Sequence, residues 1–406
     1  GLALTRSHRF DAVMATLVQS PTDPAFVQNP YLFYADALEQ GPLHFWQDYG
    51  MCAAFSHDAV HALLRDKRLG RAMPPENQVD PPYHLAPFYA VEAHSMLELE
   101  PPRHTRLRGL VLRAFTSRRI RAMEGEIAAL AHDLIDAMPR GEADLLPAFC
   151  TPLPVIVIAR LLGVPDSMAP DLLRWSNRMV AMYQANRTRA IEDDAASAAR
   201  DFAAFMRGYV SERRTRPADD LITHLIAAEE DGEKLSTDEL ITTCILLLNA
   251  GHEATVHSFG NGIKAVLENA VPRAFLARDR IADTVEEILR YDPPLHMFTR
   301  YVYEDVTLFD QPFARGDQIA LVLGATGRDP HRWAQPDRFL PDRAQHSHLA
   351  FGGGVHFCVG APLARFELAT ALPILFERLP RLQMTVPPVY GDTYHFHGLT
   401  RLIADK

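Results

Sequence analysis

The sequence Phe351-Gly-Gly-Gly-Val-His-Phe-Cys358-Val-Gly360, near the C-terminus, combines three consecutive glycines with a cysteine. Glycine permits turns that a side chain would block, so the run predicts a tight loop. Helical spacing follows, with Pro362 where a first turn tolerates proline, so we expect Cys358 at a helix N-terminus, where a thiolate is favoured. A lone cysteine is usually a buried, inert thiol. A thiolate in a glycine loop without a partner cysteine instead suits one axial metal bond, for which haem iron is the first candidate.

The loop resembles the haem-binding signature of the cytochrome P-450 family in the spacing of Phe351, Gly354, His356, Cys358 and Gly360. The resemblance implies that Cys358 is the axial ligand of the iron in haem b, and that the cofactor-binding loop includes Phe351, Gly352, His356 and Gly360. It also implies the fold, which is mainly α with a minor β region and holds the haem between a long central helix and the cysteine loop. Further motifs extend the resemblance over nearly the whole chain.

Composition narrows the class of protein. The chain has 406 residues, 48% of them hydrophobic and 23% charged, which is ordinary for a globular protein. Length alone suggests two or three domains, but no linker or repeat divides the chain, so we expect a single domain over residues 1–406. The net charge of −10 and the lack of a basic stripe argue against nucleic-acid binding. No apolar run approaches the length of a membrane span, so we expect no membrane association and a cytoplasmic location. The cysteines at 52, 150, 244 and 358 match neither a disulfide framework nor a zinc spacing.

A long helix is predicted near the middle of the chain. Ser236-Thr-Asp-Glu239 is a capping box, and the helical pattern after it runs to about residue 268, on the order of 50 Å. Its centre contains Gly251 and Glu253, and a glycine and an acid are both costly in an apolar segment. A kink and a capped polar residue would be the structural explanation. We expect instead that Gly251 permits the close approach of a flat ligand and that Glu253 is polarised or paired in a buried groove.

The same segment resembles the family's oxygen-binding groove, with one departure. The family usually places Thr directly after the acid, and its hydroxyl helps to deliver protons. This chain has Ala254 there and Thr255 next. One residue turns a helix by about 100°, so Thr255 need not face the iron. Our hypothesis is that protons travel through Glu253 and water, with a polar group of the substrate as an alternative route. The candidate catalytic residues are therefore Gly251, Glu253, Ala254 and Thr255.

Two further motifs concern the haem surroundings. His104 and Arg108 are four residues apart and share a helical face, so they can hold a carboxylate; a solvated basic face is the ordinary alternative. The resemblance assigns them, with Arg300, to the haem propionates. Glu287 and Arg290 can pair at i,i+3, which alone would indicate a surface ion pair. With Arg338 downstream, they resemble the family's structural triad, which locks the fold behind the haem.

Candidates for the substrate pocket come from several segments. Residues 73–94 read as a long loop, a region that covers the substrate in the family, although loop anchoring is an equal alternative. Met side chains on the helical stretch 170–184 could line the pocket, although a role in core packing is more common for methionine. His296 offers a polar contact, and a solvent-facing loop histidine is the alternative. The full set is Tyr83, Phe88, Tyr89, Met179, Met182, Leu247, Ala250, Leu295, His296, Met297, Phe298 and Phe396.

The resemblance implies a monooxygenase. One atom of O2 enters a C–H bond of a small organic molecule, by hydroxylation or oxidative dealkylation, and the other leaves as water with two electrons. The chain contains no flavin or ferredoxin segment, so a separate ferredoxin and ferredoxin reductase are expected to supply electrons from NAD(P)H. Two rivals remain: a peroxide-driven peroxygenase, suggested by Ala254, and a haem-thiolate sensor or electron carrier without turnover. Glu253 argues against the sensor, which needs no acid in that groove.

Overall fold

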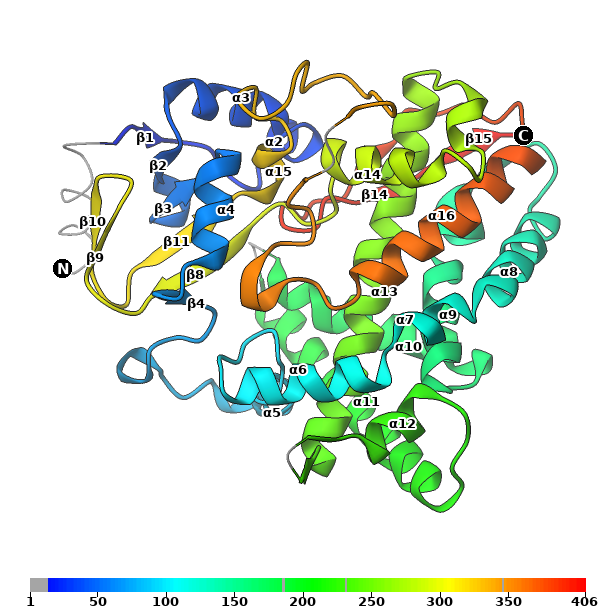
Figure 1. The fold of residues 1–406 in the computed structure, drawn as a ribbon, viewed down its shortest axis with the longest axis horizontal. Coiled ribbons are helices and arrows are strands. Elements are labelled where there is room, and N and C mark those ends of the chain that lie inside the picture. Colours follow the sequence, from blue (N-terminus) through cyan, green and yellow to red (C-terminus); the bar gives the residue numbers. More distant parts are fainter. Residues whose placement is uncertain (1–13, 185–186, 231, 345–346) are drawn as a thin grey trace. The chain divides into compact units, whose positions relative to one another are not determined.

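The computed structural model describes residues 14–184, 187–230, 232–344 and 347–406. Its contacts divide the chain into two compact units. The first unit comprises Gly1–Val79, Glu286–Cys358 and Val389–Leu399, and the second comprises Asp80–Val285, Val359–Pro388 and Thr400–Lys406. The prediction of a mainly helical chain with a minor β region is confirmed (Figure 1). None of the helices in the described ranges is long and apolar enough to cross a membrane.

A six-stranded sheet forms the centre of the first unit. Its order is β1-β2-β3-β11-β8-β4, with bounds Thr16–Leu17, Leu43–Trp46, Met51–Ala54, Gln318–Leu321, Phe298–Val302 and Leu69–Gly70. β2 and β3 are antiparallel and are joined by a short turn, as the sequence Asp48-Tyr49-Gly50 between two mainly apolar runs predicts. β11 runs parallel to β3 and antiparallel to β8. In Figure 1 the blue strands β2 and β3 and the yellow strands β8 and β11 therefore belong to one sheet although they are far apart in sequence.

Short helices accompany this sheet. They are α2 (Pro24–Gln28), α3 (Tyr31–Gln40), α4 (His57–Arg65) and α15 (Leu323–Thr326). α4 begins where the Ser56 hydroxyl accepts a hydrogen bond from the Ala59 amide, and its apolar residues pack into a core with the strands. α4 also contacts β11, α15 and the 3₁₀ turn Gly354–His356. The sheet and α4 thus support the cysteine loop. The first unit also contains the hairpin β9 (Val306–Leu308) and β10 (Gln311–Phe313), and β13 (Val389–Tyr390).

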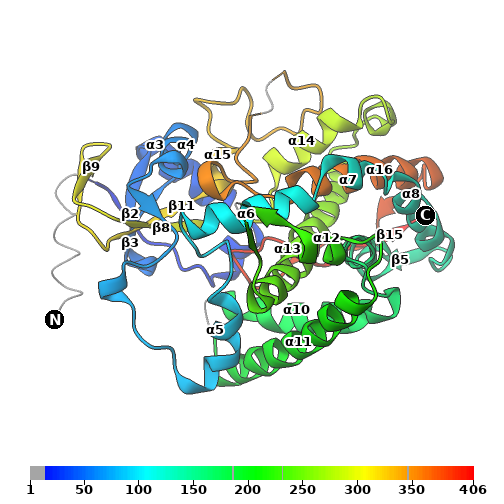
Figure 2. The ribbon, with the colours of Figure 1, turned by 60° about the horizontal axis from the view of Figure 1, so that its bottom comes forward.

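The second unit is a group of packed helices. Their bounds are α5 (Ala86–Glu92), α6 (Arg103–Ala114), α7 (Ser117–Arg121), α8 (Glu124–Asp136), α9 (Pro152–Leu162), α10 (Ala169–Val180), α11 (Arg189–Thr215), α12 (Leu221–Ala227), α13 (Thr237–Glu268) and α16 (Ala361–Arg378). α14 (Ile281–Tyr291) crosses the division between the units. Figure 2 shows α10 and α11 side by side, and both contact α13. α5 lies inside residues 73–94, where the sequence predicts only a loop, so that prediction was wrong for this segment.

The central helix α13 follows its prediction closely. Both halves of the capping box are present: the Ser236 hydroxyl accepts from the Glu239 amide, and the Glu239 carboxylate accepts from the Ser236 amide. α13 packs against α9, α10, α11 and α16. Two small sheets complete the unit, one of β12 (Gln383–Met384), β15 (Ile403–Asp405) and β5 (Glu142–Asp144), and one of β6 (Glu229–Glu230) and β7 (Glu233–Lys234). β14 (Leu399–Arg401) lies at the division between the units.

Candidate active site

The glycine loop of the first unit is folded back on itself. The Cys358 amide donates a hydrogen bond to the Phe351 carbonyl at 3.0 Å, which closes the loop. Gly352 and Gly354 have φ values of +74° and +69°, which L side chains rarely adopt. A Cβ at Gly354 would lie 2.3 Å from the carbonyl oxygen of Leu64 on α4. The glycines are therefore needed both for the turn and for its close approach to α4.

The thiol of this loop differs from the other three in the chain. Cys358 is exposed, and Val355 and Phe357 beside it are 42% and 37% exposed. Burial raises the pKa of the other three thiols, to about 12 for Cys244 and higher still for Cys52 and Cys150. An accessible thiol next to exposed apolar side chains fits a thiolate bond to the iron of a flat, apolar ring. α16 begins at Ala361, so the thiol precedes the helix by one short turn.

The middle of α13, in the second unit, has a face formed by small side chains. Ala250 is exposed and Ala254 is half-buried, although most of this helix is buried. Gly251 has a packing role: a Cβ there would lie 2.9 Å from Ile158 Cγ1, so the glycine allows α9 to approach α13. Its predicted role in the approach of a flat ligand stays a prediction. Thr255 is 4% exposed, as expected for a residue rotated away from Ala254. A helix face that carries only methyl groups, near an acid, suits the approach of a flat ligand and a substrate.

Glu253 is an acidic residue in the middle of α13. Its carboxylate accepts a hydrogen bond from the Ser176 hydroxyl of α10 at 3.4 Å, and His257 Nε2 lies 4.0 Å away, one turn further along α13. Burial raises the pKa of Glu253 to about 7, and the Ser176 hydrogen bond opposes this shift. A carboxyl group with that pKa can release and recover a proton near neutral pH. Spacing along the helix could have identified His257, but no sequence signal points to Ser176.

The predicted propionate partners are divided between the units. His104 is buried on α6, and Arg108 is half-buried one turn later on the same helix. Arg300 is buried in β8 of the first unit and donates a hydrogen bond to the Thr299 carbonyl at 3.0 Å. The shared role of these three residues stays a prediction. Arg106, which the sequence left unassigned, pairs with Glu239 at 2.5 Å and so ties α6 to the start of α13.

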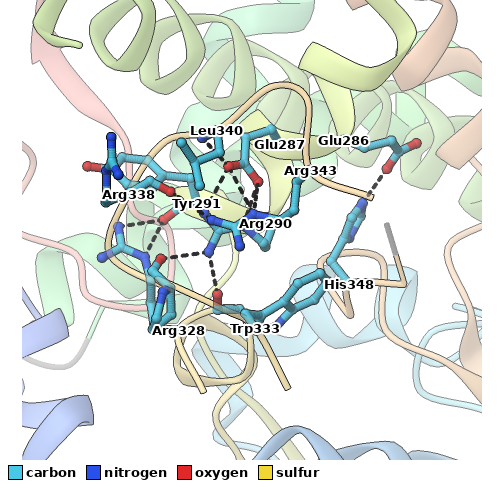
Figure 3. Close-up of polar contacts among 12 residues, drawn as sticks. Glu286, Glu287, Arg290, Tyr291, Arg328, Trp333, Arg338, Leu340, Arg343 and His348 are labelled. Carbon is cyan, nitrogen blue, oxygen red and sulfur yellow. Dashed lines mark hydrogen bonds and ion pairs between the residues drawn. The ribbon is translucent and has the colours of Figure 1, made fainter. Parts of the chain in front are cut away.

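The predicted structural triad is present in the first unit, with one member exchanged (Figure 3). Glu287 and Arg290 are buried and form two contacts, of 2.5 and 3.1 Å. The third side chain is Arg343, whose Nε lies 3.3 Å from both Glu287 oxygens. The assignment of Arg338 was wrong, because its exposed side chain bonds to Gln335 and only its carbonyl accepts from Arg290.

Arg290 also forms hydrogen bonds with the backbone of the surrounding segments. It donates to the carbonyls of Gly327 and Pro336, both at 2.7 Å. Figure 3 also shows Glu286 and His348 in contact beside the triad. A single buried guanidinium thus fixes several turns of irregular chain, which is a structural rather than a chemical role.

The predicted pocket residues have different environments. In the second unit Phe88, Met179, Met182 and Leu247 are buried, Tyr89 is 36% exposed, and Tyr83 is 94% exposed and so lies on the surface. In the first unit Leu295 and Phe396 form an isolated antiparallel bridge, Met297 is buried and Phe298 is half-buried. His296 is completely buried and bonds to Tyr34, so it is not a solvent-facing loop histidine. Contact of these residues with a substrate stays a prediction.

Known proteins are similar to this chain in both sequence and fold. The Cytochrome P450 family profile matches residues 281–387. The chain is 35% identical over 388 residues to the polyketide biosynthesis cytochrome P450 PksS of Bacillus subtilis, over 92% of this chain and 94% of that protein. It is 37% identical over 383 residues to the cytochrome P450 monooxygenase PikC of Streptomyces venezuelae, over 89% and 87%. The solved structure of P450BioI with a hexadec-9Z-enoic acid ligated acyl carrier protein matches with a TM-score of 0.87 at 30% identity, over 94% of this chain and 99% of that chain.

Proposed function

The chain belongs to the cytochrome P450 family of haem-iron monooxygenases, and we propose that it inserts one atom of O2 into a C–H bond of a small organic substrate. Hydroxylation and oxidative dealkylation share this step, because a hydroxylated carbon beside oxygen or nitrogen collapses. The observation that carries the proposal is that burial raises the pKa of Glu253 to about 7, on the part of α13 that also carries Ala250 and Ala254. A sensor or electron carrier has no use for such a proton donor.

The cofactor in this proposal is haem b. Cys358 would bind its iron, and His104, Arg108 and Arg300 would hold its propionates. When bound, a haem with a thiolate ligand supplies the activation of dioxygen. The chain supplies the thiolate, the shape of the pocket and the protons.

Proton delivery is assigned to Glu253. Ser176 holds one oxygen of its carboxyl group, and His257 lies beside the other at 4.0 Å, so the group can be reprotonated from α10 or from the next turn of α13. Ala254 offers no hydroxyl to continue the path. The last step therefore runs through water or through a hydroxyl group of the substrate.

The proposed substrate is a medium-sized, mainly apolar molecule with at least one hydroxyl group, such as a polyketide. PksS is named for polyketide biosynthesis, and P450BioI was solved with a fatty acid on an acyl carrier protein. The aromatic, methionine and leucine side chains among the predicted pocket residues suit such a molecule, free or bound to a carrier.

A separate ferredoxin with its reductase is the proposed electron source. Ferredoxins are usually acidic, so their binding would be electrostatic and would weaken as ionic strength rises. The rate of reduction by a purified ferredoxin should then fall between about 50 and 500 mM salt. An unchanged rate would argue against this type of partner.

The substrate class is tested first by a Soret titration of the ferric protein with hydroxylated polyketides, terpenoids, fatty acids and aromatic ethers. A low-spin to high-spin shift with one class identifies the molecules that enter the pocket. A peroxygenase would instead show more product with peroxide than with NADH and the redox partners, and a sensor would form no product.

The proton route is tested with Ala254→Thr, and Thr255→Val tests separately whether the neighbouring buried hydroxyl takes part. Product formed per NADH is measured for the true substrate and for an analogue that lacks its hydroxyl group. We expect Ala254→Thr to raise this ratio for the analogue only. A rise for the true substrate would disprove the substrate-assisted route.

A further inference from the structure

Asp292, His296 and His397 form a buried cluster in the first unit, away from the cysteine loop in sequence. They are 5%, 0% and 2% exposed. Each offers one ligand atom, and the three atoms lie within 4.8 Å of one another. Two imidazoles and a carboxylate are a common zinc donor set. We propose that these three residues, with a water molecule in the fourth position, form a zinc site that ties the segment after α14 to the loop before β14.

The backbone brings the two segments together without a metal. The His296 amide donates to the His395 carbonyl at 3.1 Å, and the His397 amide donates to the Pro294 carbonyl at 2.8 Å. These bonds enclose the bridge between residues 295 and 396. Asp292 precedes His296 by four residues in the non-helical segment after α14. The site is thus largely formed by the fold, as a specific metal site requires.

The distances are close to those that zinc needs. Zinc bonds of about 2.0–2.2 Å in a tetrahedron place neighbouring ligand atoms roughly 3.4 Å apart. His397 Nε2 already lies 3.2 Å from Asp292 Oδ1. No two of the three ligand atoms are more than 4.8 Å apart, so the third ligand needs to move inward by about 1.4 Å at most.

His296 supplies the second observation that points to a ligand. Its Nε2 is buried and has no hydrogen-bond partner within the described ranges. The Pro293 carbonyl acts on the pKa of this ring, but it makes no contact of hydrogen-bond geometry with Nε2. A buried polar atom without a partner is costly. A zinc ion would occupy the lone pair of this nitrogen.

The surroundings also match a metal site. The Tyr34 hydroxyl lies 2.8 Å from His296 Nδ1 and can accept a hydrogen bond from an Nδ1–H, which leaves the lone pair on Nε2 available to a metal. Tyr31 donates to Asp292 Oδ1 at 2.6 Å, and Tyr390 donates to Oδ2. Such outer partners orient the ligands of protein zinc sites. The competing occupant is an ordered water molecule that donates to His296 Nε2 while Asp292 and His397 stay an ion pair.

The experiment measures zinc per haem iron by mass spectrometry. The holoenzyme is purified from cells grown with added zinc and dialysed against graded EDTA. We expect one zinc per iron in the native protein and in His395→Gln, a control histidine in the same loop. His296→Gln and His397→Gln should lose the zinc and keep the Soret band. Tyr34→Phe should release zinc at about tenfold lower EDTA.

X-ray absorption spectroscopy at the zinc edge identifies the ligands of the ion in the native holoenzyme. This measurement does not depend on how the variants fold. The proposal expects about two imidazoles and a carboxylate around the ion. A native protein with less than about a tenth of a zinc per iron would overturn the proposal and leave water as the occupant. Zinc that persists in both His296→Gln and His397→Gln would equally overturn it, because the ion would then be bound elsewhere.

Discussion

Replacing Glu253 with glutamine should remove a specific pH dependence of stability. Burial raises the pKa of this carboxyl group from 4.5 to about 7 in the folded protein. Between these values the folded state keeps a proton that the unfolded chain releases. The free energy of unfolding of the native protein therefore falls as pH rises from about 4.5 to 7, and stays lower above that range.

The magnitude follows from the size of the shift. A pKa difference of about 2.5 corresponds to roughly 3.4 kcal/mol at full ionisation, as an upper bound. Glutamine keeps a carbonyl oxygen for the Ser176 hydroxyl and carries no charge. Relative to the native protein, Glu253→Gln should become more stable by about 1 kcal/mol at pH 5, about 2 at pH 6 and about 3 at pH 8.

Urea unfolding followed by far-ultraviolet circular dichroism between pH 5 and 8 measures this difference. Glu377→Gln, on the exposed part of α16, controls for the loss of one carboxylate. Since a chain with two units and a cofactor need not unfold in one step, the compared quantity is the shift between variant and native midpoints at each pH. A shift for Glu253→Gln that stays constant across the range would refute the assignment of a pKa near 7.

Other substitutions test the architecture around the site. Arg343→Ala should lower the free energy of unfolding by about 2 kcal/mol through the loss of charged hydrogen bonds, whereas Arg338→Ala should change it by less than about 0.5; equal losses in urea unfolding would contradict the corrected triad. Gly354→Ala should reduce the haem bound per chain in a pyridine haemochrome assay, because of its positive φ and the close α4 carbonyl, whereas Gly353→Ala, with extended backbone beside a flexible side chain, should not. Gly251→Ala should cost about 1–3 kcal/mol by overlap with α9, and a Soret change without loss of stability would indicate that the glycine faces the haem instead.

Local patterns in the sequence predicted a large part of the fold. The capping box placed the start of α13 at the correct residue, and the hairpin around Tyr49 followed from its turn residues. These features depend on neighbours in sequence, so spacing alone identifies them. The same reasoning missed α5, because its Pro- and aromatic-rich sequence has no clear helical period and its helix depends on packing against α11.

The site was predictable only where a motif is local. The pairing of Glu287 with Arg290 follows from their spacing, but the choice between Arg338 and Arg343 depends on how an irregular segment folds. Ser176 reaches Glu253 from another helix, and no periodicity encodes that contact. Buried polar partners that are distant in sequence are set by tertiary packing, which a single sequence does not reveal.

The long helix α13 also restricts which insertions and deletions the protein can tolerate. Its capping box fixes the start of the helix at Ser236, and Glu253 reaches Ser176 only because a set number of residues separates the two points. One inserted or deleted residue between them would rotate Glu253 by about 100° and carry it roughly 1.5 Å along the axis. This segment should therefore accept many substitutions but no insertion or deletion, unless compensated by another within the same helix. Differences in length among related sequences should fall in the loops that precede and follow it.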